Sequence, residues 1–311
     1  MTSSSPYLSI IIPVYDDKEG LRQTLISLEK QKGEHPFEVI IADNGSSDGT
    51  WELAQEYSQK REHFFAIQES EIQSSYGARN RGLTLVRGEV IAFIDANMTV
   101  ESTYVEKVAH RFQNTSVDYL ANKVVVPETK ESLSGLFNSL TGFPVDRYLA
   151  RGHYAPTCCL VVRQSLFGLI GTFDHRLESG GDMEFGQRAF LAGLNQEFAE
   201  EIVMTHPPRK KLGSLIKKEK RIARGHAQLT FFYPQRYSLF RDLYLGSTKY
   251  VFPSNPIKHR RKAKERGISL SPREALVLSV LHFPISWAGF FSYVKEATRL
   301  RALQGSQRDS D

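Results

Sequence analysis

Cysteine is nearly absent from this chain of 311 residues, and the two that occur, Cys158 and Cys159, are sequence neighbours. Neighbouring cysteines exclude a disulfide framework and lack the spacing of a zinc site, so a reducing, cytoplasmic setting fits. Residues 1–6 lack the basic start and the apolar core of a secretory signal. The glycine-rich loops of the Rossmann and Walker A types are also missing, which argues against dinucleotide binding and ATP hydrolysis.

Acidic residues are scarce in one region of the sequence. Residues 206–267 contain 17 Lys and Arg but 3 Asp and Glu, whereas the net charge of the whole chain is +5. A basic region beside an otherwise acidic chain favours anionic lipid head groups or phosphate-bearing ligands as partners. A solvated basic face is the alternative. No nucleic-acid recognition motif accompanies the region, so we expect no nucleic-acid partner.

Short apolar runs alternate with helical patterns in the first hundred residues. The composition predicts buried strands at 7–15, 37–43, 64–68 and 90–94. Helical spacing of apolar residues predicts a helix up to about residue 30; a second helix is expected at about 51–60, and residues 77–82 are expected to open a third helix before the fourth strand. This order predicts an α/β fold with a doubly wound, mostly parallel sheet flanked by helices. We expect Pro13 to close the first strand, because proline cannot donate to a central ladder.

The second half of the sequence has weaker patterns. Residues 119–126 and 157–162 have the composition of two further strands. Residues 132–154 between them are mixed, and their aromatic residues and glycines would suit a loop on the acceptor side of a binding site.

Two of the expected strands end in an aspartate. Asp95 ends the run 90–94 and Asn97 follows two residues later, so both could offer oxygens to one hard cation, Mg²⁺ or Mn²⁺. Asp43 ends the run 37–43, where it could accept from a base N–H while the turn after it holds ribose or phosphate. Open α/β sheets bind ligands at this carboxyl edge. A polar turn that merely ends a strand is the alternative for Asp95.

A third polar segment surrounds Asp182. Gly180 and Gly181 permit a close backbone approach just before it. Glu184 and Arg188 are spaced to pair on the following helix, which leaves Asp182 at the helix start, where the dipole favours its ionised form. A simple N-cap is the alternative role for Asp182.

Taken together, these segments resemble the family 2 inverting glycosyltransferases of the GT-A fold, enzymes of bacterial-type glycan and polysaccharide biosynthesis. The matching pieces are residues 11–15, 43–50, 77–82, 88–97 and 181–188. The resemblance covers about residues 7 to 206. It implies a hexosyltransferase that moves a sugar from a nucleotide-diphospho-sugar to an acceptor hydroxyl, on a glycan or lipid-linked acceptor, with inversion. A metal and cationic side chains would neutralise the departing diphosphate, and a carboxylate would deprotonate the acceptor.

The resemblance also implies roles for individual residues. The implied nucleotide-binding residues are Pro13, Val14, Tyr15, Asp43, Asn44, Gly77, Arg79, Asn80 and Asp95. The implied ligands of the divalent metal are Asp95, Asn97 and His206, and Asp182 is the implied general base, supported by Glu184 and Arg188. The family's metal motif is Asp-x-Asp, and because Asn97 brings no charge we expect a lower metal affinity. For His206 the alternative is a surface histidine at a strand end.

The C-terminal part contains 20 uncharged residues at 275–294, enough to span a bilayer. His282 and Pro284 weaken a span, and Trp287 and Tyr293 favour membrane interfaces. An interfacial helix or hairpin, a span, and packing on the catalytic domain all remain open. We expect a catalytic domain at 1–235 and a basic, partly apolar helical region at 236–311. That region would hold the protein peripherally on the inner face of an anionic cell membrane.

Two other functions are compatible with such a fold. A sugar nucleotidyltransferase would need a glycine- and arginine-rich triphosphate loop near the N-terminus, which we do not find in the sequence. A catalytically weak or silent nucleotide-sugar-binding homologue is suggested by Asn97 alone.

Overall fold

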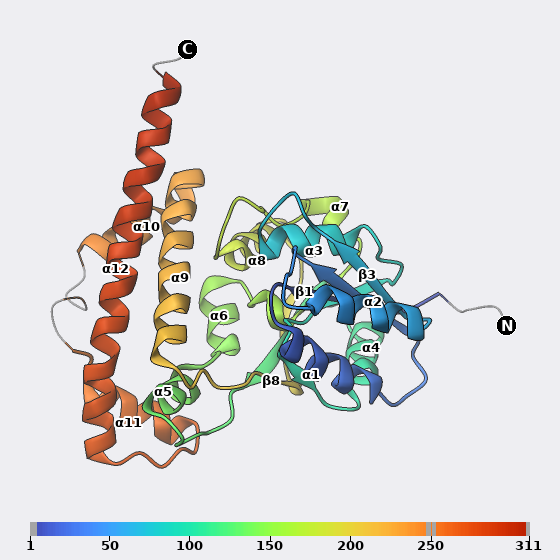
Figure 1. Ribbon diagram of the computed structural model, residues 1–311, viewed down its shortest axis with the longest axis horizontal. Coiled ribbons are helices and arrows are strands. Elements are labelled where there is room, and N and C mark those ends of the chain that lie inside the picture. The colour runs from blue at the N-terminus through green and yellow to red at the C-terminus, as the bar shows by residue number, and fades with distance from the viewer. Residues whose placement is uncertain (1–4, 247–249, 251–252, 309–311) are drawn as a thin grey trace. The chain divides into compact units, whose positions relative to one another are not determined.

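The computed structural model describes residues 5–246, 250 and 253–308, with side chains described up to residue 305. The chain forms two compact units (Figure 1). Unit 1 consists of Met1–Val125, Phe143–Arg176 and Gly181–Pro207. Unit 2 consists of Val126–Gly142, Leu177–Gly180 and Pro208–Asp311. The functional division at residue 235 that the sequence suggests stays a prediction.

Unit 1 is built on a mixed sheet, which has eight strands in the described part of the chain, in the order β3-β2-β1-β4-β7-β6-β8-β5. The pairs within β3-β2-β1-β4 and the pair β6-β8 are parallel, whereas β7 is antiparallel to both of its neighbours and β5 is antiparallel to β8. The strands are β1 (Leu8–Val14), β2 (Phe37–Asp43), β3 (Phe64–Gln68), β4 (Val90–Phe93), β5 (Thr99–Val100), β6 (Tyr119–Val125), β7 (Leu160–Arg163) and β8 (Gln196–Thr205).

Helices connect and cover these strands. They are α1 (Lys18–Glu29), α2 (Thr50–Lys60), α3 (Ser75–Leu83), α4 (Tyr104–Asn114), α6 (Val145–Gly152), α7 (Leu166–Ile170) and α8 (Gly181–Leu191). The predicted β-α-β-α-β-α-β order of the first 95 residues is confirmed. The apolar runs of β1 and β4 are buried throughout and that of β2 is buried after Phe37, as expected for strands with neighbours on both sides.

The prediction that Pro13 closes the first strand is wrong, because β1 continues to Val14 in register with β2. The bond from the Ile94 N–H to the Ile11 carbonyl shows that Ile11 faces β4. Alternation along the strand then points the Pro13 nitrogen to the same side. The pairing of β4 with β1 stops at Ile11, and the next bond of this parallel ladder would need the N–H that Pro13 lacks, so Pro13 ends the ladder on the β4 side only.

Two segments of the second half differ from expectation. The expected strand at 157–162 begins as a 3-10 turn, η1 (Thr157–Cys159), and becomes strand β7 at Leu160. The unassigned residues 132–154 form two helices, α5 (Leu133–Thr141) in unit 2 and α6 in unit 1. Short helices of this kind depend on tertiary packing, which local composition does not reveal.

Unit 2 is helical. Besides α5 it contains α9 (Leu212–Phe232), α10 (Pro234–Leu245), α11 (Pro256–Glu265) and α12 (Pro272–Arg308). Helices α9 and α12 lie side by side (Figure 1). One apolar cluster joins Leu215 of α9 to Leu278 and Ile285 of α12, and a second joins Ala223 and Ala227 of α9 to Tyr293 of α12. The expected helical character of the C-terminal region, with one apolar helix, is thereby confirmed.

Candidate active site

The loops after β1 and β2 are fastened to each other by side chains that accept from backbone N–H groups. The Asp16 carboxylate accepts from the Ser47 N–H at 2.8 Å, and the Asp48 carboxylate accepts from the Lys18 N–H at 3.2 Å. The Thr50 hydroxyl also donates to Asp48 and is the main cause of its lowered pKa. These bonds hold the two loops at the carboxyl edge of the sheet, where α/β folds bind ligands.

Asp43 lies at the end of β2 and is completely buried. Its Oδ2 accepts from the N–H groups of Gly45 and Ser46, both at 3.0 Å, and from the Gln68 amide at 3.1 Å. Its Oδ1 is buried and has no hydrogen-bond partner among the described residues. A buried acceptor without a partner is costly, so this oxygen is suited to accept from a ligand N–H.

Two other residues that the sequence assigns to nucleotide binding, Asn44 and Gly77, stabilise the loop after β3. The Asn44 amide donates to the carbonyls of Glu69 and Ile72, at 3.0 and 2.8 Å, and so fixes the loop after β3. A Cβ on Gly77 would lie 2.9 Å from the Ile72 side chain, so the glycine permits α3 to approach this loop. Tyr15, by contrast, is 55% exposed beside these loops, as a side chain that stacks on a ligand would be.

Arg79 joins α3 to the end of β4. Its guanidinium is buried and contacts the Asp95 carboxylate at 2.5 Å, and it also donates to the Ser75 carbonyl at 3.1 Å. Asp95 itself is 41% exposed, so one partner of this ion pair faces solvent. The pair therefore places a fixed positive charge beside the carboxylate that the sequence assigns to the metal.

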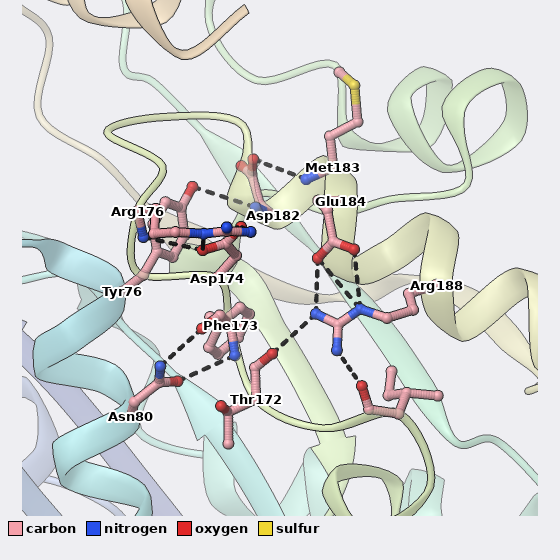
Figure 2. Close-up of polar contacts among 11 residues, drawn as sticks. Tyr76, Asn80, Thr172, Phe173, Asp174, Arg176, Asp182, Met183, Glu184 and Arg188 are labelled. Atoms are coloured by element: carbon pink, nitrogen blue, oxygen red, sulfur yellow. Dashed lines mark hydrogen bonds and ion pairs between the residues drawn. The ribbon is translucent and has the colours of Figure 1, made fainter. Parts of the chain in front are cut away.

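Tyr76 connects Arg79 to the segment around Asp182, and Figure 2 shows its contact with Asp182. The Arg79 guanidinium lies 5.6 Å from the centre of the Tyr76 ring, and the Tyr76 hydroxyl accepts from the Asp182 N–H at 3.2 Å. A Cβ on Gly181 would lie 2.7 Å from the Tyr76 ring. Glycine at 181 is therefore what lets the start of α8 approach α3 so closely.

Asp182 is the second residue of α8, so it lies inside the first helical turn and not at the N-cap. Its Oδ1 accepts from the Met183 N–H at 2.9 Å. Burial is the main reason that the pKa of Cys159 is raised, Cys158 is the next, and the charges of Asp95 and Asp182 both raise it further. Burial, and next the charge of Asp182, also raise the pKa of Tyr154.

The expected pairing of Glu184 with Arg188 is confirmed. Arg188 donates to both carboxylate oxygens of the buried Glu184, at 2.7 to 3.2 Å, and also to the carbonyls of Ile170 and Thr172 (Figure 2). Asn80 holds the same loop from the other side, because its amide exchanges two bonds with the Phe173 backbone, at 2.8 and 3.1 Å. Both residues therefore support the loop that precedes Asp182.

The residues present fit a divalent ion that is shared with a substrate. Asn97 has φ +82°, and its Oδ1 is buried with no hydrogen-bond partner among the described residues. That orphan oxygen and the half-exposed Asp95 are ligands that Mg²⁺ and Mn²⁺ prefer. In the part of the chain that the structure describes, no three His, Cys, Asp or Glu side chains gather around one point. The other ligands would then be diphosphate oxygens and water, as is common for Mg²⁺.

His206 is buried, so the alternative of a surface histidine is wrong. Its Nδ1 lies 2.7 Å from the Pro207 carbonyl, and its ring lies 5.2 Å from that of Phe143. A ring nitrogen that donates to a carbonyl fixes the tautomer, as is usual for metal-bound histidines. Its role as a metal ligand stays a prediction.

Comparison with known proteins decides the family. The family model described as glycosyl transferase family 2 matches residues 9–166. The chain belongs to glycosyltransferase family 2. Glycosyltransferase AglE of Haloferax volcanii is 32% identical over 231 residues, which are 74% of this chain and 76% of that protein. The uncharacterized glycosyltransferase YfnE of Bacillus subtilis is 36% identical over 106 residues, 34% of this chain and 27% of that protein.

Solved structures show the fold of this family 2 glycosyltransferase to be GT-A. The mannosyltransferase PcManGT of Pyrobaculum calidifontis, solved with GDP-Man and Mn²⁺, has a TM-score of 0.60 and 15% identity, over 94% of this chain and 88% of that one. TarS of S. aureus, residues 1–349 with UDP, has a TM-score of 0.53 and 19% identity, over 95% and 91%. The predicted fold class is confirmed.

Sequence reasoning missed Tyr76. It lies directly before the Gly77–Gly82 motif, but a tyrosine at a helix start usually signals packing. Its link to Asp182 joins residues 106 positions apart, and such a separation leaves no local pattern.

Proposed function

We propose that this family 2 glycosyltransferase moves a hexosyl group from a nucleoside-diphosphate sugar to an acceptor hydroxyl, with inversion at the anomeric carbon. The observation that carries the proposal is the chain of contacts from Asp95 through Arg79 and Tyr76 to Asp182. These contacts join Asp95, which would hold a metal on the diphosphate of the donor, to Asp182, which would accept the proton of the acceptor hydroxyl.

In this proposal Asp43 binds the nucleobase through its unpartnered Oδ1, which accepts from a base N–H. The exposed ring of Tyr15 would lie against the nucleoside, beside the 44–50 turn, in which the N–H groups of Gly45, Ser46 and Ser47 already donate to Asp43 and Asp16. Pro13 and Val14 form the end of β1, directly before the loop that carries Tyr15.

Asp182 is the proposed general base. It would take the proton of the acceptor hydroxyl as the oxygen attacks the anomeric carbon, and one displacement with one base inverts that centre. Tyr76 would position Asp182 through its backbone N–H, and Glu184 and Arg188 would keep the preceding loop in place.

Asp95 and Asn97, with His206 as a further candidate, would hold a divalent ion on the diphosphate. When bound, such an ion neutralises the charge that develops on the leaving group. The guanidinium of Arg79 beside Asp95 would add a second, fixed positive charge in a buried setting. The complex of PcManGT with GDP-Man and Mn²⁺ supports this choice of ion class.

We also propose that the enzyme works at the cytoplasmic face of a membrane, on a glycan or lipid-linked acceptor. The basic composition of residues 206–267 and the apolar helix α12 support this placement.

A panel of nucleotide sugars tests the function. The purified protein is incubated with UDP-, GDP- and dTDP-sugars and Mn²⁺, and slow hydrolysis of the donor is followed, because water can replace the acceptor. We expect one donor to be hydrolysed and the rate to fall with chelator. The absence of hydrolysis together with tight nucleotide-sugar binding would instead identify a silent homologue.

A further inference from the structure

Unit 2 contains most of the exposed large apolar side chains of the described residues, namely twelve of eighteen. Six of them lie on α12, and five of these, Leu276, Val277, Val280, Trp287 and Phe291, have exposed fractions between 39% and 58% and lie within one stretch of 16 residues. Their spacing places them on one side of the helix over about 22 Å, at 1.5 Å per residue. We call these five residues the outer stripe. Exposed apolar stripes of this size mark interaction sites.

The opposite side of α12 is already occupied. Leu278, Ile285 and Tyr293 belong to the two apolar clusters shared with α9 and its neighbours in unit 2. Glu296 on the same side accepts from the buried Gln228 of α9 at 3.0 Å. The outer stripe is therefore a second apolar face on a helix whose first face is part of a folded core.

Charge indicates what covers the stripe. The exposed cations Arg273 and Lys295 lie at its two ends on the same side of α12. Helix α11, which packs on α12 through Ala263, adds the exposed cations Lys258, Arg260, Arg261 and Lys264. An apolar stripe with aromatic members and cations at both ends is complementary to an anionic bilayer, because the apolar side chains suit the acyl boundary and the cations suit the phosphates.

The packing of α12 also decides between lying in the membrane and crossing it. Its length and its uncharged apolar stretch would permit a span. However, Lys217, Lys220 and Arg221 of α9 are exposed along the helix on which α12 packs. A span that kept this contact would bring those cations into hydrocarbon, and a span that broke it would expose both apolar clusters.

We propose that α12 lies in the plane of an anionic membrane, with the outer stripe in the head-group and acyl boundary and the other side packed on α9. This inference deepens the membrane placement proposed above, and it is independent of the identity of the donor. Trp287 would then lie at the interface. In a span it would lie near the bilayer centre, because it is close to the middle of residues 275–294.

The first experiment measures flotation of the full chain with vesicles of phosphatidylcholine alone or with an equal part of phosphatidylglycerol. Leu276→Ser with Phe291→Ser should lower the partition coefficient on the anionic vesicles on the order of tenfold to a hundredfold. Both side chains are 57% exposed, so the variant should fold. The matched control, Leu169→Ser with Leu191→Ser, removes residues that are 71% and 67% exposed in unit 1, and should leave binding unchanged.

Depth is measured by Trp287 fluorescence in a Trp51→Phe background, since the chain has two tryptophans. Lipids brominated near the head group should quench more strongly than lipids brominated near the chain end. Stronger quenching from the chain end would overturn the in-plane placement in favour of a span.

A stripe variant that binds vesicles like wild type, or a concentration-dependent dimer that the variant abolishes, would overturn the membrane as occupant. Donor hydrolysis by the stripe variant should stay normal, which separates failure of docking from failure of the chemistry.

Discussion

Replacement of Asp182 by Asn is the sharpest test of the proposed chemistry. The structure indicates that the change is nearly neutral for folding, because an amide oxygen can still accept from the Met183 N–H at 2.9 Å. The bond from the Asp182 N–H to the Tyr76 hydroxyl uses the backbone and is unaffected by the substitution. What Asn loses is basicity, and general-base catalysis contributes about 10²- to 10⁴-fold.

We therefore expect turnover by Asp182→Asn to fall by about 10²- to 10⁴-fold, or about 2.7 to 5.5 kcal/mol in the activation free energy. Nucleotide affinity and the melting temperature should change little. The measurements are initial rates with the donor found in the nucleotide-sugar panel, calorimetric titration with the nucleoside diphosphate, and thermal unfolding.

Glu184→Gln is the matched control. Glu184 is buried and pairs with Arg188, so its substitution should lower the free energy of unfolding by about 1–3 kcal/mol and leave the folded enzyme active. Wild-type turnover in Asp182→Asn would refute the reasoning. A large loss in Glu184→Gln together with a silent Asp182→Asn would transfer the role of base to Glu184.

Three further substitutions test the other parts of the site. Asp95→Asn should weaken Mn²⁺-dependent nucleotide binding and nearly abolish transfer. It should also lower the melting temperature, because Arg79 is buried and loses its charged partner. Unchanged turnover would show the metal assignment to be wrong. Asn97→Asp should raise the apparent affinity for Mn²⁺ if residue 97 is a ligand, as read from the metal dependence of the rate. Gly181→Ala would place a Cβ 2.7 Å from the Tyr76 ring, so it should destabilise the fold by about 1–3 kcal/mol and reduce turnover. Gly168→Ala, which meets nothing within 4 Å, is its control, and equal effects of the two would contradict the close-approach argument.

The sequence by itself determined the features that have a local cause. Apolar runs, their spacing and the turn residues after them predicted β1 to β4 and the helices between them, because side-chain periodicity is set by the backbone geometry of each element. The positions of Asp43 and Asp95 at strand ends followed from the same patterns. The pairing of Glu184 with Arg188 followed from helix geometry alone.

Tertiary structure alone decided whatever depends on distant segments. Whether Pro13 ends a strand depends on how far β4 runs beside it, and whether residues 157–159 pair depends on the strands around them. The antiparallel insertion of β7 between β4 and β6 has no local signal either, because strand pairing is a contact between segments far apart in sequence.

The site shows the same division. The sequence indicated Arg79 and Asp95 as separate residues of two motifs, and packing of α3 made them an ion pair. The contact of Tyr76 with Asp182 spans 106 positions and depends on glycine at 181, so it exists only once α3 and α8 are in place. For α12, composition favoured an interfacial helix or hairpin and left a span and packing on the catalytic domain as alternatives. Burial supports the proposed in-plane placement, because it shows which side of the helix is already used by the core.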